Sequence, residues 1–206
     1  MQRRHLVVMV KEPRPGRVKT RLAAGLGAVG AAWWYRHQCA HVLRRLKDAR
    51  WHLWLAVAPD REGLTSRVWP AHLPRLAQGQ GDLGARMGRI FRSLPPGPAI
   101  IVGSDIPGIS RAHIAAAFKG LGHAPSVLGP APDGGYWLVG LRRTRVPAHL
   151  FEGVRWSSAH ALTDTKATMD APVAHAATLD DVDTPEDLQR LLAQHKQTQE
   201  PHRKPR

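Results

Sequence analysis

The sequence predicts an α/β fold in which helices cover both faces of a mostly parallel sheet. Short apolar segments alternate with helical ones along the chain, and its 206 residues suit one domain with a full core. The apolar share of 43% and the charged share of 22% are ordinary for a globular protein. Strand–helix alternation of this kind favours a parallel sheet, whose ligands bind beyond the carboxyl ends of the strands.

Each element has its own signal in the sequence. Compact apolar runs predict strands at His5–Val10, His52–Ala58, Ala99–Val102, Ser126–Leu128, Tyr136–Leu141 and, more weakly, Pro172–Thr178. Helical patterns predict helices at Ala28–Leu46, Asp82–Ser93, Ser110–Phe118, Ser158–Met169 and from Thr184 onward. Ser110 is the expected cap of its helix, and Thr184-Pro-Glu-Asp187 reads as a variant capping box.

The predicted domain covers residues 1–194, and residues 195–206 form a basic tail that we expect to be disordered. A single cysteine, Cys39, excludes an internal disulfide framework, and with no visible signal peptide we expect a cytoplasmic protein. No apolar run approaches the roughly 20 residues of a membrane span. The net charge of +14 favours anionic partners, although arginines spread along the whole chain also suit a generally basic proteome.

A basic loop follows the first predicted strand and leads toward a helix. It concentrates five cations in eleven residues: Lys11, Arg14, Arg17, Lys19 and Arg21. Gly16 permits a tight turn, and cations near a helix start suit the phosphates of a nucleotide. A solvated basic loop is the alternative. The segment lacks the glycine and Gly-Lys pair of a P-loop.

A second glycine-rich segment, Gly25–Gly30, has the glycine spacing of the dinucleotide-binding pattern but not its position in the chain. That pattern belongs directly after a strand, whereas this segment begins well beyond Val10. A helix turn or kink is the better interpretation.

Carboxylates follow two other predicted elements. Asp105 comes just after a buried strand, and Asp183 lies just before the last helix, outside its cap. Magnesium usually takes one or two protein carboxylates together with substrate phosphates. Asp105 and Asp183 are therefore candidate ligands of Mg²⁺ (or Mn²⁺) if the sheet brings their loops together, while a turn-forming role is the alternative for Asp105.

Two further segments combine glycine with polar residues. Asp133-Gly134-Gly135-Tyr136 precedes a strand and could approach a metal, a sugar hydroxyl or an acceptor, although Asp-Gly is also a strong hairpin signal. The segment Gln78–Met87 could contact a base or ribose through backbone and amide groups, and a plain loop is its alternative.

The chain resembles the small bacterial GT-A-fold transferases of the DUF2064 group. These are similar to the molybdenum-cofactor and phospholactate guanylyltransferases. The resemblance covers most of the chain up to about Leu192, through ordered segments at Lys11–Leu22, Gln80–Met87, Gly103–Pro107, Gly129–Leu141, Trp156–Ser158 and Asp181–Leu188. Trp156-Ser-Ser158 stands where the family pattern expects Trp-Ser-Thr.

The resemblance implies a single Rossmann-like GT-A domain of the nucleotide-diphospho-sugar transferase type. It implies nucleotide contacts at Lys11, Gly16, Arg17, Lys19, Arg21, Gly81, Asp82 and Gly84. It implies acceptor contacts at Asp133, Gly134, Gly135 and Tyr136, catalytic roles for Lys19, Arg21 and Asp133, and Mg²⁺ or Mn²⁺ held by Asp105 and Asp183.

The leading functional hypothesis is metal-dependent nucleotidyl transfer from a nucleoside triphosphate to a small phosphorylated acceptor. Glycosyl transfer from a nucleotide sugar is the close alternative, but the Asp-x-Asp motif of many such enzymes is absent at mid-chain. A nucleic-acid-binding protein is a distant alternative, because no recognition motif is present and aromatic residues do not interleave with the basic ones. A binding module without turnover is a further possibility.

Other chemistry lacks support in the sequence. Twelve histidines invite a zinc interpretation, but there is no His-Glu-x-x-His and a single cysteine cannot build a thiolate cluster. No Gly-x-Ser-x-Gly elbow presents Ser104 as a nucleophile. Cys39 lies within a predicted helix and is expected to belong to the core.

Overall fold

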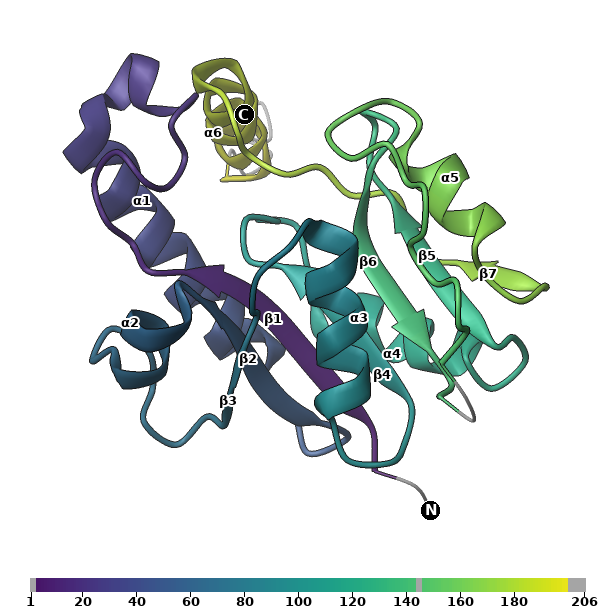
Figure 1. Cartoon of the computed structure of the whole chain (residues 1–206). Helices are drawn as coiled ribbons and strands as arrows, with labels where there is room; N and C mark the ends of the chain where they lie inside the picture. The colour runs from purple at the N-terminus through teal and green to yellow at the C-terminus, as the bar shows by residue number, and fades with distance from the viewer. Residues whose placement is uncertain (1–2, 144–145, 200–206) are drawn as a thin grey trace.

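Seven strands form one sheet in the computed structural model, which describes residues 3–143 and 146–199 (Figure 1). They are β1 (His5–Lys11), β2 (His52–Ala58), β3 (Arg75–Ala77), β4 (Ala99–Gly103), β5 (Ser126–Pro130), β6 (Tyr136–Leu141) and β7 (Val173–His175), in the order β3-β2-β1-β4-β6-β5-β7. Only β6 runs antiparallel to its neighbours, β4 and β5. The prediction of a mostly parallel sheet is confirmed.

Helices cover both faces of this sheet (Figure 1). They are α1 (Ala23–Leu46), α2 (Asp60–Thr65), α3 (Leu83–Ser93), α4 (Arg111–Gly120), α5 (Ala161–Ala167) and α6 (Pro185–Gln199). The sequence did not predict α2 and β3. Both are short, and β3 is a strand because it pairs in parallel with β2, a contact that no local pattern reveals.

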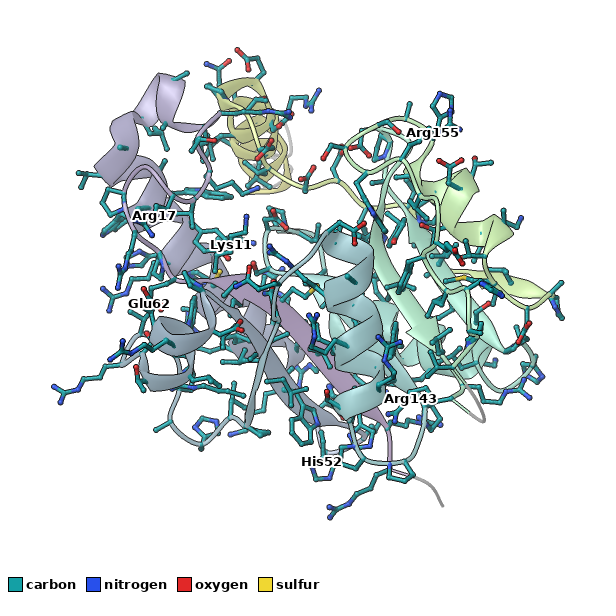
Figure 2. The ribbon with its side chains drawn as sticks, in the orientation of Figure 1. Lys11, Arg17, His52, Glu62, Arg143 and Arg155 are labelled. Atoms are coloured by element: carbon teal, nitrogen blue, oxygen red, sulfur yellow. The ribbon has the colours of Figure 1, made fainter. Side chains whose placement is uncertain are left out.

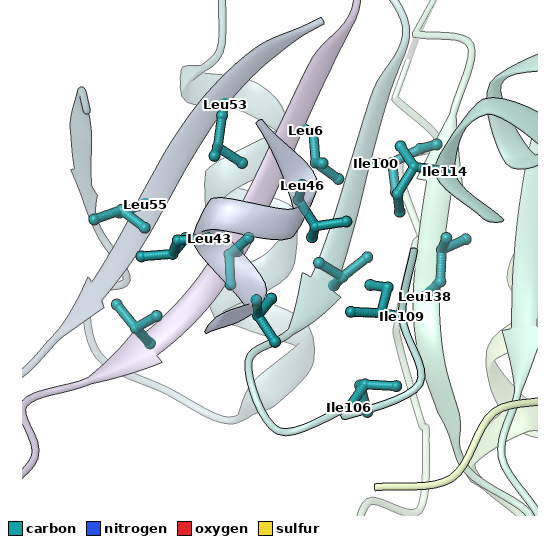
Figure 3. Close-up of a cluster of buried hydrophobic side chains, with 14 of the residues drawn as sticks. Leu6, Leu43, Leu46, Leu53, Leu55, Ile100, Ile106, Ile109, Ile114 and Leu138 are labelled. Carbon is teal, nitrogen blue, oxygen red and sulfur yellow. The ribbon is translucent and has the colours of Figure 1, made fainter. Parts of the chain in front are cut away.

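The core consists of one apolar layer on each side of the sheet. Leu6 and Val8 of β1 face the layer formed with α1 and α4, whereas Val7 faces the layer formed with α3 and α5. This alternation follows from the period-2 geometry of a strand. Figure 3 shows the first layer, where Leu43 and Leu46 of α1 pack over the strands.

Helix α1 contains the glycine-rich segment that resembles a dinucleotide fingerprint. Gly27 sits inside it with φ of 68° and ψ of 162°, so two helical pieces join at a kink. The segment is not a strand-to-helix phosphate turn, and the interpretation as a helix kink is confirmed.

The last helix extends further than the sequence predicted. Its start carries the expected cap, because the Thr184 N–H donates to Asp187 Oδ2 at 2.8 Å and the Asp187 N–H donates to Thr184 Oγ1 at 3.2 Å. The helix continues to Gln199, five residues past the position 194 at which the sequence placed the end of the domain. Glutamine and lysine are good helix formers, and such residues can prolong a helix that tertiary packing has started. The rest of the predicted tail, 200–206, lies outside the described residues.

Across residues 3–143 and 146–199, none of the helices combines the length and the apolar character that crossing a bilayer requires.

Candidate nucleotide site at the carboxyl edge of the sheet

A cleft of about 670 Å³ lies over the carboxyl ends of β1 and β4. These strands are parallel neighbours at the centre of the sheet, with Val8 opposite Val102 in register. Because β2 and β4 lie on opposite sides of β1, the strand order reverses here, and ligands of such sheets bind beyond the strand ends at a reversal of this kind. Figure 2 shows Lys11 and Arg17 on the side of this edge where α1 begins.

A lysine and two aspartates meet at the centre of the cleft. The Lys19 ammonium donates to Asp105 Oδ2 at 2.6 Å and to Asp183 Oδ1 at 3.3 Å. Arg21 contacts the other oxygen of Asp183 at 3.2 Å. The Lys19 side chain is only 6% exposed, whereas that of Arg21 is 75% exposed. The structure thus brings two cations of the predicted basic loop into contact with the two aspartates predicted as a pair of metal ligands.

The backbone explains how residues so distant in sequence converge. Lys19 has a left-handed conformation with φ of 47°, which costs a non-glycine residue about 1–2 kcal/mol. The Lys19 side chain at this turn reaches Asp105 and Asp183. On the opposite side, the Val182 N–H donates to the carbonyl oxygen of Asp105 at 3.2 Å and holds the two acidic loops together.

Lys19 stays charged in this cluster, and neighbouring carboxylates repel one another. Burial lowers the pKa of Lys19, but the attraction of Asp105 and Asp183 outweighs it, and the net pKa is raised. Burial, with the repulsion of Asp105, raises the pKa of Asp181 to about 6. Asp181 is half-buried beside this cluster, and this position follows only from the fold. A further cation bound beside these aspartates would offset their negative charge.

A buried tyrosine, Tyr35, connects the end of β1 with the loop after β4. The Tyr35 hydroxyl on α1 accepts from the Lys11 N–H at 2.9 Å and lies 3.0 Å from the Ser104 hydroxyl. Ser104 therefore has a structural partner and lies beneath Asp105. Cys39, one turn further along α1, is fully buried, and burial raises the pKa of its thiol to about 12. The expectation that Cys39 belongs to the core is confirmed.

The glycine-rich loop before α3 is held in place by arginines. Arg89 donates to the carbonyl oxygens of Gln78 and Gln80, and Arg86 donates to that of Gly81 at 3.0 Å. The Gln78 amide is committed to the carbonyl oxygens of Val10 and Ala56, at 3.1 and 2.8 Å. The Gln78 side-chain N–H groups are therefore engaged within the protein, and the contact of this segment with a base or ribose stays a prediction.

The Asp133-Gly-Gly segment forms the turn of a hairpin between β5 and β6. The Gly135 N–H donates to Asp133 Oδ1 at 2.9 Å, and the exposed aspartate lies outside the residues that line the cleft. Tyr136, which follows, does line the cleft, and its hydroxyl accepts from Thr165 Oγ1 at 3.2 Å. Asp133 therefore belongs to a hairpin turn, as the Asp-Gly signal in the sequence indicated. Its catalytic role stays a prediction.

Some of the other predicted site residues line the cleft, and others do not. Lys11, Arg17, Lys19, Arg21, Gly81, Asp82, Asp105, Tyr136 and Asp183 line the cleft, whereas Gly16, Gly84, Gly134 and Gly135 do not. Gly84 lies buried beneath Trp156 and Phe151, where a Cβ would approach Trp156 Cζ2 within 2.8 Å. The sequence missed Arg86 and Ser157 as lining residues. The family-like segment at Trp156 was the only signal that could have pointed to Ser157.

The hairpin turn predicts a stability effect that can be measured. Gly134 has φ of 83°, and a Cβ there would lie 2.3 Å from the carbonyl oxygen of Ala159. Gly134→Ala is expected to destabilise the protein by about 2–4 kcal/mol, through backbone strain and a clash with main-chain atoms. Urea denaturation measures this. The matched control is Gly153→Ala, where φ is 71° but the space is open, so only about 1–2 kcal/mol of strain is expected. Equal losses in both variants would contradict the clash.

The residues present suit a hard divalent cation. Three carboxylate oxygens of Asp105 and Asp183 lie within hydrogen-bonding distance of the cationic groups of Lys19 and Arg21, so this position attracts positive charge. In the described part of the chain, no group of three or more His, Cys, Asp or Glu side chains forms a complete metal cage. Two carboxylates completed by substrate phosphates are the arrangement that magnesium usually adopts.

Comparison with known proteins agrees with this fold. A protein from Desulfovibrio desulfuricans G20, described as a candidate nucleotide-diphospho-sugar transferase, is 31% identical, covers 97% of this chain and 90% of its own, and superposes with a TM-score of 0.86. Rv0371c from Mycobacterium tuberculosis H37Rv (16% identity, 93% and 98% coverage, TM-score 0.59) shares the fold. So does the inositol-1-phosphate CTP transferase from T. maritima (12% identity, 94% and 96% coverage, TM-score 0.56). No curated protein matches the sequence.

Fold and site together define the class of nucleotide-dependent transferases with a nucleotide-diphospho-sugar transferase fold. The family described as "Uncharacterized protein conserved in bacteria (DUF2064)" matches residues 42–158. The chain belongs to this DUF2064 family.

Proposed function

We propose that the protein transfers a nucleotidyl group from a nucleoside triphosphate to a small phosphorylated acceptor in a divalent-metal-dependent reaction. The observation that carries the proposal is the cluster of Lys19, Asp105 and Asp183 at the central edge of the sheet. This cluster offers a fixed cation for phosphates beside two carboxylates for a metal. A transferase that moves a phosphoryl-type group needs both charges close together.

In the proposed reaction, an oxygen of the acceptor phosphate attacks the α-phosphorus. A new P–O bond forms as the bond to the bridging oxygen breaks, and pyrophosphate leaves with the electron pair. Lys19 and Arg21 orient the phosphates and offset the charge that develops on them; losing one such donor typically costs about 3–4 kcal/mol in the transition state. Mg²⁺ or Mn²⁺ held by Asp105 and Asp183 would supply Lewis-acid stabilisation of the phosphate oxygens.

The rigid loop Gln78–Asp82 is the proposed nucleoside contact, and the β5–β6 hairpin with Tyr136 is the proposed acceptor side. The support for the first is that Arg86 and Arg89 hold this loop at the cleft. The support for metal use is the carboxylate pair, together with a manganese complex known for Rv0371c, which has the same fold.

Glycosyl transfer from a nucleotide sugar is the second candidate. The description of the D. desulfuricans protein favours it. Against it stands the position directly after β4, where Gly103 and Ser104 precede Asp105 and the Asp-x-Asp pair of many glycosyltransferases is absent. The two reactions release different products, pyrophosphate in one and a nucleoside diphosphate in the other.

The test incubates the purified protein with each nucleoside triphosphate, Mg²⁺ or Mn²⁺ and a panel of phosphorylated acceptors, and measures pyrophosphate. We expect pyrophosphate in a one-to-one ratio with a nucleotidylated acceptor for one base. Parallel reactions contain nucleotide sugars and monitor nucleoside diphosphates. Release of UDP or GDP with no pyrophosphate in any reaction would overturn nucleotidyl transfer in favour of glycosyl transfer.

A further inference from the structure

A second concave site lies beside the carboxyl half of α1, where this helix meets β2 and the segment 68–73. It has a volume of about 550 Å³. We call it the α1 groove; its lining residues are Arg36, His37, Ala40, Leu43, Arg44, Lys47, Leu53, Val68, Trp69, Pro70, His72 and Leu73. None of them lines the central cleft.

The rim of the α1 groove is cationic. Arg36, Arg44 and Lys47 are exposed and recur at helical spacing, so they share one face of α1. His37 and His72 stand beside them, and no acidic residue lines the groove. Like charges gathered without a counter-charge repel one another, and this repulsion is relieved when an anion binds.

Nearby acids do not neutralise this rim. Among the described residues, no carboxylate forms an ion pair with Arg36, Arg44 or Lys47, and Arg44 contacts the ring of His41 at 3.2 Å. Asp48, the acid next to Lys47 in the chain, is engaged by Arg50 at 2.8 Å. The cations therefore face solvent with their charge available.

The floor of the α1 groove is apolar. Leu43 and Leu53 close it from α1 and β2, and Val68 and Leu73 close it from the loop. Trp69 lies there too, 4% exposed, and its indole nitrogen is buried without a described hydrogen-bond partner. An apolar floor under a basic rim matches a molecule with an apolar body and an anionic end.

We propose that the α1 groove is a binding site for a small organic phosphate whose apolar portion fills the floor while its phosphate contacts Arg36, Arg44 and Lys47. The site is separate from the proposed catalytic cleft and does not depend on the proposed function. A nucleotide and a single-chain lipid phosphate share this chemistry. Arginine can form bidentate contacts to the phosphate oxygens of either ligand.

The test uses octyl phosphate, adenosine monophosphate, inorganic phosphate and octanol as probes of the whole protein by calorimetry. We expect octyl phosphate or adenosine monophosphate to bind at least tenfold more tightly than inorganic phosphate or octanol. The tighter of the two identifies the source as lipid-like or nucleotide-like. Amide shifts in the NMR spectrum should move at 36–47 and 68–73, and not only at 11–21 and 103–105.

Arg44→Gln with Lys47→Gln removes two rim charges and should weaken that binding at least tenfold. The control is Arg61→Gln with Arg92→Gln, which changes the net charge equally at exposed positions elsewhere and should leave binding unchanged. Nucleoside triphosphate binding in the central cleft should survive the first pair, while Lys19→Met should spare the α1 groove. Equal losses in both pairs, binding no tighter than that of inorganic phosphate, or shifts confined to the central cleft would overturn the proposal.

Discussion

Asp105→Asn is expected to remove metal binding and turnover together while leaving the fold intact. Asparagine keeps the shape of the side chain but loses the charge that lies 2.6 Å from Lys19 and, by our proposal, one of the two metal ligands. Removing a residue that only supports a metal ligand costs roughly 10–100-fold in affinity, so loss of a ligand should cost at least as much. Manganese titration followed by electron paramagnetic resonance, in the presence of a non-hydrolysable nucleotide, measures the effect.

Asp180→Asn is the matched control for this experiment. Asp180 is an exposed acid in the segment that also carries Asp183, and its substitution removes the same formal charge. We expect manganese affinity in this variant to stay within about twofold of the unmodified protein, since exposed charges beyond the first contact are screened by salt. If Asp105→Asn bound manganese as tightly as Asp180→Asn does, the assignment of the metal site would fail.

Lys19→Met is expected to change metal and nucleotide binding in opposite directions. The ammonium occupies the position between Asp105 and Asp183, where it competes with a divalent cation for the same oxygens. Without it, manganese should bind the nucleotide-free protein more tightly, because two carboxylates are left facing each other without a partner. Nucleotide affinity should fall about tenfold or more, since a buried charge-assisted contact to phosphate is lost.

The same variant should lose stability when no metal is present. Breaking a buried ion pair by removing one partner typically costs about 3–5 kcal/mol; the aspartates are partly exposed here, so a smaller loss is expected. Manganese should raise the melting temperature of Lys19→Met more than that of the unmodified protein. Arg21→Gln is the control, and its mostly exposed side chain predicts smaller changes in every measurement. Weaker manganese binding by Lys19→Met than by the unmodified protein would show that the ammonium is not a competitor.

Much of the fold follows from local sequence signals. Apolar runs such as His5–Val10 and Ala99–Val102 identified central strands because strands buried on both faces need apolar side chains at every position. The caps at Ser110 and Thr184 are also local, since a side chain and a backbone N–H within three residues form them. The short strand β3 escaped prediction because its pairing with β2 creates it.

The candidate site was predictable as a set of residue types but not as a geometry. The sequence alone pointed to the basic loop with Lys19 and to Asp105 because these charged residues follow buried strands, and to Asp183 because it lies just outside the cap of the last helix. The tertiary structure decided that the lysine lies between the two aspartates and that Asp133 belongs to a hairpin turn. It also decided that Asp181 is half-buried and that α1 carries a basic groove. Each of these depends on the strand order β1-β4-β6-β5 and on helix packing, which join segments that have no local interaction in the sequence.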